Sequence, residues 1–407
     1  MFTLKRVLLI ILLLLVAALI GYGLYYMFTR VGAPGKVPIS PELPGATVTL
    51  PGAGMRPATT AAEVGQPVGV LPPGGVIQPG TPSYFKPAAV TQVSTDYATN
   101  PSLNAGGAYR YYNATDGKFY RVGADGKITS LSEQVFYNAS NVTWAKGKDV
   151  AVIEYPDDSK IIYNFETQKQ VSLPKHWTEF SFAPDGGQVA AKSIGLAPEN
   201  RWLVTINNDG TNARNIEPMG DYADEVTVDW SPSRQVVAFS MTGEPLGSER
   251  REVLLIGLNG ENFKSTVVEG LGFEPQWSPT GKKLLYSVYN ANSDYKPELW
   301  IVNSYGDQIG SDRKTVKLNT WADKCSFGDD NTLFCAVPKD LPEGAGMSRE
   351  VANESYDNLY KVDLKTGLKT PINLNGDYTI TNISYDTARN KVIFTDLNKT
   401  GVFEAKL

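Results

Sequence analysis

The sequence predicts an all-β fold, a seven-bladed β-propeller of four-stranded antiparallel blades, and three observations lead to this prediction. A short hairpin built around one apolar anchor residue recurs at intervals of 38 to 58 residues. A second hairpin with its own glycine turn follows most copies. The composition, with 21 Tyr and 11% aromatic residues, suits pleated and half-buried strands. Six blades is the alternative if the weakest copy is not a blade.

The recurring hairpin consists of an apolar anchor, a polar turn, and a second apolar residue six or seven positions later. In QWSPTGKKLLYS, residues 276–287, Trp277 is matched in this way with Leu284. In TWAKGKDVAVIE, Trp144 is matched with Val150. The copy at Leu103 is the weakest of the set. The predicted anchors are Leu103, Trp144, Phe182, Trp230, Trp277, Phe327 and Tyr385.

The second hairpin has a short turn such as Asn-Asp-Gly in WLVTINNDGTNARNI or Lys-Thr-Gly in NLYKVDLKTGLKTPINL. Glycine adopts the positive φ that such short connections require. Two hairpins in every 40–50 residues make one four-stranded blade, and a repeat of this period is typical of a propeller.

The two ends of the repeat region favour a closed ring that covers residues 88–407. Residues 401–407 supply a third strand to the last blade, but no fourth strand follows. Upstream of the first anchor, Ala88–Thr95 reads as a strand with no partner of its own. Pairing these two segments would complete the last blade and remove two open sheet edges.

The repeat resembles that of TolB-type β-propellers. Trp-Ser-Pro-Thr-Gly at 277–281 and Phe-Ala-Pro-Asp-Gly at 182–186 carry this resemblance. The copies at Trp144, Phe327 and Tyr385 lack the Ser-Pro, and the Trp-Asp and Gly-His signatures of WD repeats are missing. The resemblance covers about residues 88–407 and is specific for the fold. It implies protein–protein contact in the cell envelope, but no site residue of the family can be carried over.

Residues 1–30 are predicted to be a membrane anchor. Residues 7–28 contain no charged side chain and are long enough to cross a hydrocarbon core of about 30 Å as one helix. Bulky side chains such as Tyr25 and Met27 stand where a cleaved signal peptide would have small residues, so we expect an uncleaved helix. Lys5 and Arg6 favour a cytoplasmic amino terminus and an extracytoplasmic propeller.

Residues 31–87 are predicted to be a flexible linker. This stretch contains 12 Pro and 10 Gly in 57 residues and almost no aromatic side chains, so it cannot bury a core. Its expected role is to give the propeller reach from the membrane.

Little in the sequence points to catalysis, and we expect no enzyme activity, no catalytic residue and no cofactor. The net charge of −5 argues against nucleic acid as a partner. One histidine, His176, and two cysteines leave no ordinary zinc site, so no metal is expected. A nucleophilic triad would depend on His176, and no Gly-x-Ser-x-Gly elbow is present. An envelope glycan hydrolase or lyase that uses carboxylates from different blades is the alternative.

The two cysteines flank the hairpin anchored at Phe327. Counting two residues outward from Phe327 and Leu333 places Cys325 opposite Cys335. Directly opposed residues in antiparallel strands lie close enough for a disulfide. A disulfide and two reduced, buried thiols are both compatible with this spacing.

The predicted binding surface is the face of the propeller that carries the long loops. The connections between second and third strands are long in four consecutive blades, at residues 194–200, 241–252, 289–298 and 338–357. The connections between blades emerge on the same face and each carries an aromatic residue. These candidate residues are Tyr137, Trp177, Tyr222, Phe273, Trp321 and Tyr378. They predict an aromatic platform for a peptide or glycan, and packing between blades is the alternative.

Together, these features predict a membrane-anchored, single-pass protein whose propeller lies in the periplasm or at the cell surface. Its expected function is a non-catalytic scaffold that binds a protein, or a peptide or glycan of the cell envelope. A structural subunit of a surface complex is a further alternative.

Overall fold

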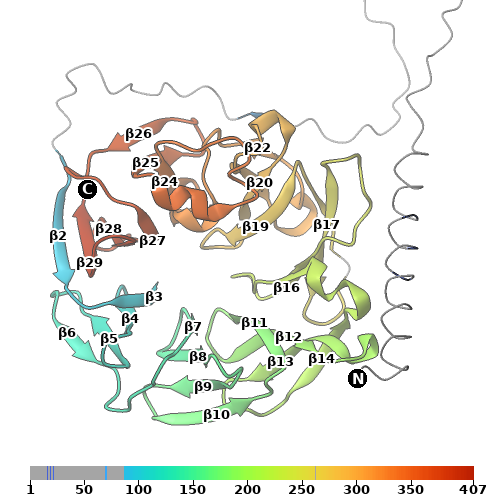
Figure 1. Ribbon diagram of the computed structural model, residues 1–407, viewed down its shortest axis with the longest axis horizontal. Coiled ribbons are helices and arrows are strands. Elements are labelled where there is room, and N and C mark those ends of the chain that lie inside the picture. The colour runs from blue at the N-terminus through green and yellow to red at the C-terminus, as the bar shows by residue number, and fades with distance from the viewer. Residues whose placement is uncertain (1–15, 17–18, 20–21, 23–68, 71–86, 262) are drawn as a thin grey trace, which may run out of the picture. The chain divides into compact units, whose positions relative to one another are not determined.

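The computed structural model describes residues 87–261 and 263–407, together with residues 16, 19, 22, 69 and 70 (Figure 1). By its internal contacts the chain forms two units, residues 1–64 and residues 65–407. In the second unit, seven β-sheets are arranged around one axis, and each has a blade of four antiparallel strands. The sheet of blade 5 has the short strand β1 (Gly69–Val70) as a fifth, parallel member. The predicted seven-bladed, four-stranded propeller is therefore confirmed, and the six-bladed alternative is wrong.

Each of the first four blades uses four strands that are consecutive in sequence. Blade 1 contains β3 (Ala98–Leu103), β4 (Tyr109–Asn113), β5 (Lys118–Val122) and β6 (Ile128–Ser130). Blade 2 contains β7 (Asn141–Trp144), β8 (Val150–Glu154), β9 (Lys160–Asn164) and β10 (Lys169–Leu173). Blade 3 contains β11 (Trp177–Phe182), β12 (Gln188–Ile194), β13 (Arg201–Asn207) and β14 (Arg214–Pro218). Blade 4 contains β15 (Val226–Val228), β16 (Val236–Ser240), β17 (Arg251–Gly257) and β18 (Thr266–Val268).

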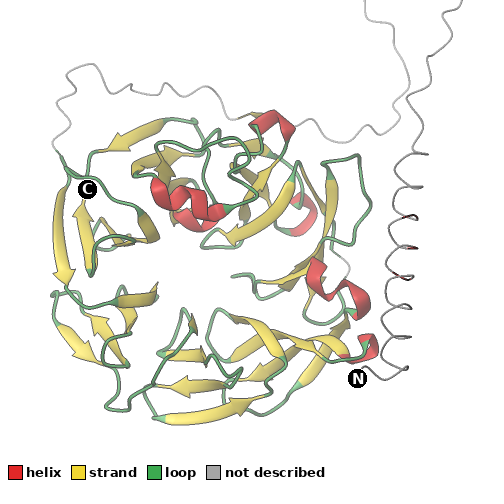
Figure 2. Ribbon diagram, in the orientation of Figure 1, coloured by secondary structure: helices red, strands yellow, loops and turns green. Residues whose placement is uncertain are grey.

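Blades 5 and 6 follow the same pattern. Blade 5 contains β19 (Leu271–Trp277), β20 (Lys283–Tyr289), β21 (Glu298–Asn303) and β22 (Lys314–Thr315). Blade 6 contains β23 (Cys325–Asp329), β24 (Thr332–Pro338), β25 (Asp357–Asp363) and β26 (Lys369–Ile372). Six 3-10 helices lie in connections between described strands (Figure 2). They are η1 (Pro198–Asn200), η2 (Gly220–Glu225), η3 (Ala291–Ser293), η4 (Gly306–Gln308), η5 (Ala322–Lys324) and η6 (Arg349–Glu354).

Blade 7 closes the ring with strands from both ends of the propeller. Its inner three strands are β27 (Ile380–Asp386), β28 (Lys391–Asp396) and β29 (Val402–Lys406), and its outer strand is β2 (Ala89–Ser94). The register of β2 with β29 places Val90 opposite Ala405. The predicted closure is confirmed, and it pairs the edge of β29 that would otherwise be open.

The anchor hairpins form the first two strands of each blade. Trp277 is opposite Leu284, as predicted from the repeat. At Trp144 the prediction is wrong by one residue, because Ala145 donates its backbone N–H to the carbonyl of Val150 and Trp144 is then opposite Ala151. Trp230 lies just outside β15.

The anchor side chains join neighbouring blades. The indole of Trp277 in blade 5 stacks on Phe239 of blade 4 with ring centroids 5.1 Å apart. Its Nε1 also donates to the carbonyl oxygen of Asp229, 3.2 Å away. In the same way Trp144 donates from Nε1 to the carbonyl of Asn100 in the preceding blade.

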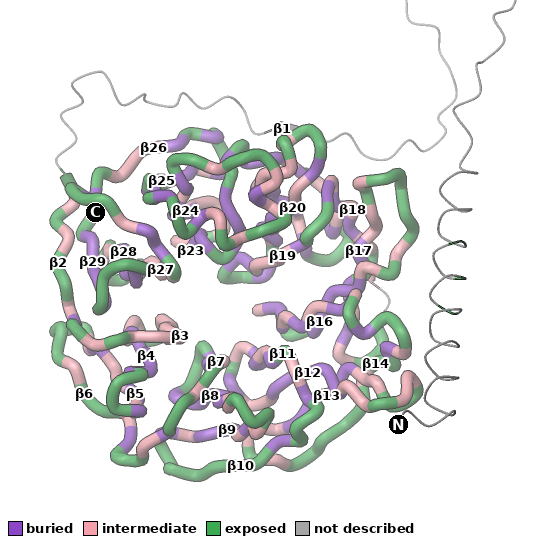
Figure 3. Tube along the Cα trace, in the orientation of Figure 1, coloured by how far each residue is buried: buried purple, intermediate pink, exposed green. Residues whose placement is uncertain are grey.

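Buried side chains are concentrated in the strands, whereas exposed segments lie mostly on connections and outer strands (Figure 3). The second strands are especially buried, and every residue of β16 has little exposed surface. Buried ion pairs add polar links between blades. Arg110 in blade 1, with no exposed surface, donates to Asp149 of blade 2 at 3.1 Å. Lys324 and Asp357 form a second buried pair at 2.9 Å, and this pair lies within blade 6.

The predicted anchor and linker fall mainly outside the described residues. Of residues 7–28, only Val16, Leu19 and Tyr22 are described, and they are helical. In the described part of the chain, no helix has the length and apolar character needed to cross a membrane. Of residues 31–87, the structure describes Pro87 and the short strand β1 (Gly69–Val70), which pairs in parallel with β22 of blade 5.

Candidate functional site

The propeller has two faces that differ in their connections. Strands in a blade alternate in direction, so connections from the first to the second strand and from the third to the fourth leave at one end. We call this end the turn face. The other connections form the loop face, at residues 95–97, 114–117, 131–140, 155–159, 174–176, 195–200, 219–225, 241–250, 269–270, 290–297, 316–324, 339–356, 373–379 and 397–401.

The loops of blades 4, 5 and 6 form one continuous layer on the loop face. Ala291 of the blade 5 loop donates its backbone N–H to Glu249 of the blade 4 loop at 3.0 Å. Gly346 of the blade 6 loop donates to the carbonyl of Tyr295 at 2.8 Å, and Gly344 donates to Asp294 at 2.9 Å. Three of the four long loops predicted from the sequence, those of blades 4, 5 and 6, therefore lie against one another.

Exposed apolar side chains gather on the loop face. Of the twelve large hydrophobic residues that are exposed within 87–261 and 263–407, nine lie on its connections or directly beside them. Leu196 is fully exposed. The nine are Tyr97, Tyr137, Leu196, Tyr222, Leu246, Leu271, Met347, Tyr356 and Leu397. The other three are Leu254, Tyr305 and Leu368. Exposed apolar side chains gathered on one face are typical of an interaction surface.

Acidic side chains are also concentrated on the loop face. Its connections contain more than twice as many Asp and Glu residues as Lys and Arg residues. On the connections of the turn face, acidic and basic residues are almost equal in number. The net charge of −5 is modest, but the negative charge is concentrated on the loop face. A surface of one sign of charge attracts molecules of the opposite sign.

The six predicted aromatic residues do not form one exposed ring. Trp177, Phe273 and Trp321 are each less than 10% exposed and belong to the core between blades. Tyr137 and Tyr222 are 76% and 61% exposed. The predicted aromatic platform is therefore wrong for the three buried residues. Trp177 begins β11 and Phe273 lies within β19, and both pack in cores shared with the preceding blade. Trp321 directly precedes η5, and the guanidinium of Arg349 lies over its ring.

Tyr378, the sixth predicted aromatic residue, is half-buried. Its ring packs on Phe394 and Phe403 at centroid distances of 5.1 and 5.7 Å. Sequence reasoning missed the exposed residues Leu196, Met347 and Tyr356. The sequence feature that could have identified them is a large apolar side chain inside a long polar loop, rather than an aromatic residue just before an anchor.

Trp321 contacts a charged cluster at the loop-face end of blades 5 and 6. The guanidinium of Arg349, the first residue of η6, lies 5.1 Å from the centroid of the indole. The same guanidinium donates to both oxygens of Asp323 at 2.6 Å and lies 3.5 Å from Glu274. Burial raises the pKa of Glu274, the charge of Asp323 adds to this effect, and Arg349 opposes it. The cluster thus holds two carboxylates around one cation.

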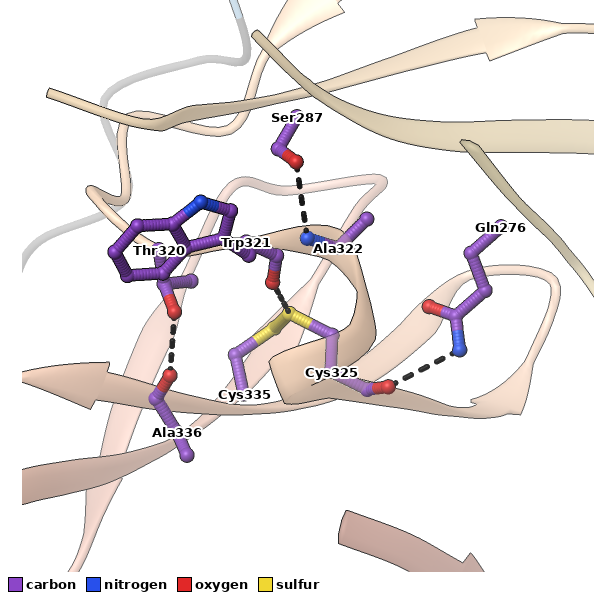
Figure 4. The surroundings of a disulfide bond; sticks show 8 residues. All are labelled: Gln276, Ser287, Thr320, Trp321, Ala322, Cys325, Cys335 and Ala336. Carbon is purple, nitrogen blue, oxygen red and sulfur yellow. Dashed lines mark hydrogen bonds between the residues drawn. A yellow bond between two sulfur atoms is a disulfide. The ribbon is translucent and has the colours of Figure 1, made fainter. Parts of the chain in front are cut away.

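A disulfide lies next to Trp321 (Figure 4). Cys325 and Cys335 are opposite each other in β23 and β24, as the sequence predicts, and their Cα atoms are 4.1 Å apart. Sγ of Cys325 lies 4.0 Å from the carbonyl oxygen of Trp321. Gln276 of blade 5 donates to the carbonyl of Cys325 at 3.1 Å. The disulfide therefore joins the first two strands of blade 6 beside the charged cluster.

Residues with metal-binding or acid–base chemistry are dispersed. Among the described residues, no group of three or more His, Cys, Asp or Glu side chains is arranged to hold a metal ion. His176 is exposed, and its carbonyl accepts from the N–H of Ile194. Burial raises the pKa of Asp229, on the turn face, to about 7, whereas Lys146 of blade 2 acts to lower it. No second carboxylate contributes to this rise in the pKa of Asp229.

Comparisons with known proteins show the fold. No protein-family model matches the chain, and no curated protein matches its sequence. The β-propeller domain of Cps50 (Swd1) from Myceliophteria thermophila is 11% identical with a TM-score of 0.52, over 79% of this chain and 100% of that one. An oligogalacturonate lyase from Vibrio parahaemolyticus is 12% identical with a TM-score of 0.53, over 78% and 93%. TolB from Acinetobacter baumannii is 12% identical with a TM-score of 0.43, over 64% and 62%. The first two of these structures confirm the predicted fold-level resemblance to β-propellers, and at such identities they show the fold alone.

Proposed function

We propose that this propeller is a non-catalytic scaffold that binds a partner protein on its loop face. The observation that carries the proposal is the gathering of exposed apolar side chains on one face of the ring. Leaving such side chains in water has a cost in solubility, whereas burying them against a partner stabilises a complex. The loops that present them are held by a closed ring, so their positions change little on binding.

We further propose that the scaffold is tethered to a membrane and acts outside the cytoplasm. The uncharged run 7–28 supports an anchor of one helix, and the Pro- and Gly-rich residues 31–68 support a long tether. The disulfide between Cys325 and Cys335 supports an oxidising location, because such bonds persist outside the cytoplasm. The partner would then be a protein of the cell envelope.

The test compares two sets of substitutions in the full-length protein, with capture of partners by crosslinking in native membranes. The loop-face variant carries Leu246→Asp, Leu271→Asp and Met347→Asp. The control variant carries Tyr305→Asp and Leu368→Asp, which are similarly exposed residues on the turn face. We expect the loop-face variant to lose the partner and the control to retain it, with the melting temperature unchanged in both. Retention by the loop-face variant, or equal loss in both, contradicts the proposal.

A further inference from the structure

Three aromatic rings near the loop face are each covered by a basic side chain of the same chain. Arg349 lies over Trp321 at 5.1 Å, and Nζ of Lys339 lies 5.7 Å from the ring of Tyr356. Nζ of Lys399 lies 3.7 Å from the ring of Tyr378. Cations are attracted to the negative face of an aromatic ring, most strongly to that of tryptophan. The same arrangement therefore occurs three times over blades 5 to 7.

Each of these cations also meets an oxygen acceptor. Arg349 donates to Asp323, and Lys339 donates to the carboxylate of Asp377 at 2.7 Å. Lys399 donates to the backbone carbonyl of Asp377. An aromatic face with an oxygen beside it forms a site for a cation, and in this structure each site holds a side chain of the protein itself.

The site at Trp321 is the most complete of the three. The guanidinium of Arg349 lies over the indole, its Nη2 donates to both oxygens of Asp323, and its Nη1 lies 3.5 Å from Glu274. One planar cation with several nitrogens can meet all three groups, whereas a compact ammonium has a single nitrogen. Glu274 adds a second carboxylate, so the site retains an excess negative charge with Arg349 in place. The raised pKa of Glu274 agrees with this excess, because burial and the charge of Asp323 both act against its ionisation.

Arg349 is held weakly enough to leave this site. Its side chain is 42% exposed, and those of Glu274 and Asp323 are 44% and 57% exposed. Ion pairs at this degree of exposure contribute little to stability, because water screens the two charges. The backbone of the loop is anchored separately, because Ala345 and Ala352 are buried. Rotation of the Arg349 side chain therefore opens the site without unfolding the loop.

We propose that Trp321, Asp323 and Glu274 form a guanidinium-binding site, which Arg349 fills in the unbound protein and an arginine of the partner fills in the complex. This inference rests on the proposed function and names the chemistry of the partner, an arginine-containing segment of a protein. The acidic character of the loop face favours such a segment. The exposed side chains of Leu271 and Met347 supply apolar surface for its neighbours.

The test uses N-acetyl-arginine amide as a probe and follows the indole N–H signals of the tryptophans by NMR. Arg349→Ala empties the site, and Arg251→Ala removes another arginine that pairs with a loop-face carboxylate, Glu225. We expect Arg349→Ala to bind the probe about tenfold more tightly than the wild type or Arg251→Ala, because charge-assisted contacts with Asp323 and Glu274 become available to the probe. Addition of Asp323→Asn to Arg349→Ala should abolish this gain.

The neutral isostere N-acetyl-citrulline amide is the ligand control, since it keeps the shape of arginine without the charge. Equal binding of the two probes, or no gain in Arg349→Ala over Arg251→Ala, overturns the proposal. If Arg349→Ala lowers the melting temperature, Arg349→Gln is used in its place, because it keeps much of the side chain and removes the charge.

This outcome is independent of the partner-capture experiment, which alters Leu246, Leu271 and Met347. Loss of capture without probe binding leaves the scaffold function standing and removes the arginine site. If the probe binds but the loop-face variant still captures the partner, the guanidinium-binding site stands and the proposed role of the exposed apolar residues is contradicted.

Discussion

The loop face and the turn face of this propeller are built from the same strands but differ in the constraints on their residues. On the turn face the connections are mostly short, and their residues pack against the next blade. Gly186, for example, has a φ of 67°, and a Cβ at this position would lie 3.0 Å from the Cβ of Ala145 in blade 2. On the loop face Leu196 touches solvent over its whole side chain. Residues of these turns hold the ring together, whereas the exposed side chains of the loop face can vary at little cost to the fold.

The difference explains why the most conspicuous motif in the sequence is structural. The Trp-Ser-Pro-Thr-Gly segment at 277–281 enters a turn of the turn face, where the backbone N–H of Gly281 donates to the carbonyl of Ser278. Its tryptophan is buried between blades 4 and 5. The segments that carry the exposed apolar and acidic residues have no repeated pattern.

The largest expected effect tests whether buried anchors and exposed loop-face side chains contribute differently to the free energy of unfolding. Trp277→Ala removes a side chain that is 6% exposed and stacked on Phe239, and it should lower the free energy of unfolding by about 3–5 kcal/mol. Met347→Ala on the loop face should change it by less than about 0.5 kcal/mol. Urea unfolding followed by tyrosine and tryptophan fluorescence measures both. A similar loss in the two variants would remove the distinction between the faces.

A smaller effect is expected from the disulfide, which supports the blade 6 strands next to the charged cluster. Reduction of the bond between Cys325 and Cys335 releases a constraint on a short loop of the unfolded chain and should cost about 2–3 kcal/mol. Urea unfolding with and without a reductant measures this cost. The double variant Cys325→Ala, Cys335→Ala is the control and should not respond to the reductant. Thiols that react in unfolded but unreduced wild-type protein would contradict the presence of the bond.

The smallest effect concerns Asp229, a carboxyl on the turn face whose pKa is raised from 3.8 to about 7. A raised pKa means that the folded protein keeps the proton to higher pH than the unfolded chain does. The corresponding stability is present below about pH 4 and is lost as the pH rises through 7. Asp229→Asn removes this loss, so at pH 8 the variant should be more stable than the wild type by about 1–2 kcal/mol. This value is below that of the full shift, because the residue keeps part of its surface accessible.

The control for this pH dependence is Asp209→Asn, also on the turn face. Hydrogen bonds from Thr211 lower the pKa of Asp209, so its replacement should bring no gain at pH 8. Unfolding of the three proteins in urea at pH 4 and pH 8 separates these cases. An equal gain for both variants would show a general charge effect rather than burial of Asp229.

Much of the scaffold could be predicted from the sequence because local patterns encode it. Strand alternation and glycine turns predict hairpins, and the unpaired segment before the first anchor predicts the closing strand β2. The opposition of Cys325 and Cys335 follows from counting along one hairpin. At the second anchor the predicted register was wrong by one residue, because Val150 is opposite Ala145 rather than Trp144.

The candidate site was harder to predict because it depends on contacts between distant segments. Trp177, Phe273 and Trp321 resemble Tyr137 and Tyr222 in their position before an anchor, yet only the two tyrosines are exposed. The partner of Trp321 is Arg349, which comes from a different loop of blade 6. No local spacing rule links these two residues.

The sequence by itself determined a closed ring of four-stranded blades, because hydrophobic periodicity and turn chemistry act over a few residues and repeat along the chain. Only the tertiary structure decided which face carries exposed apolar and acidic side chains and which cation lies on which ring. Those contacts join loops from blades 4 to 7, and their geometry depends on how the blades pack rather than on any single segment.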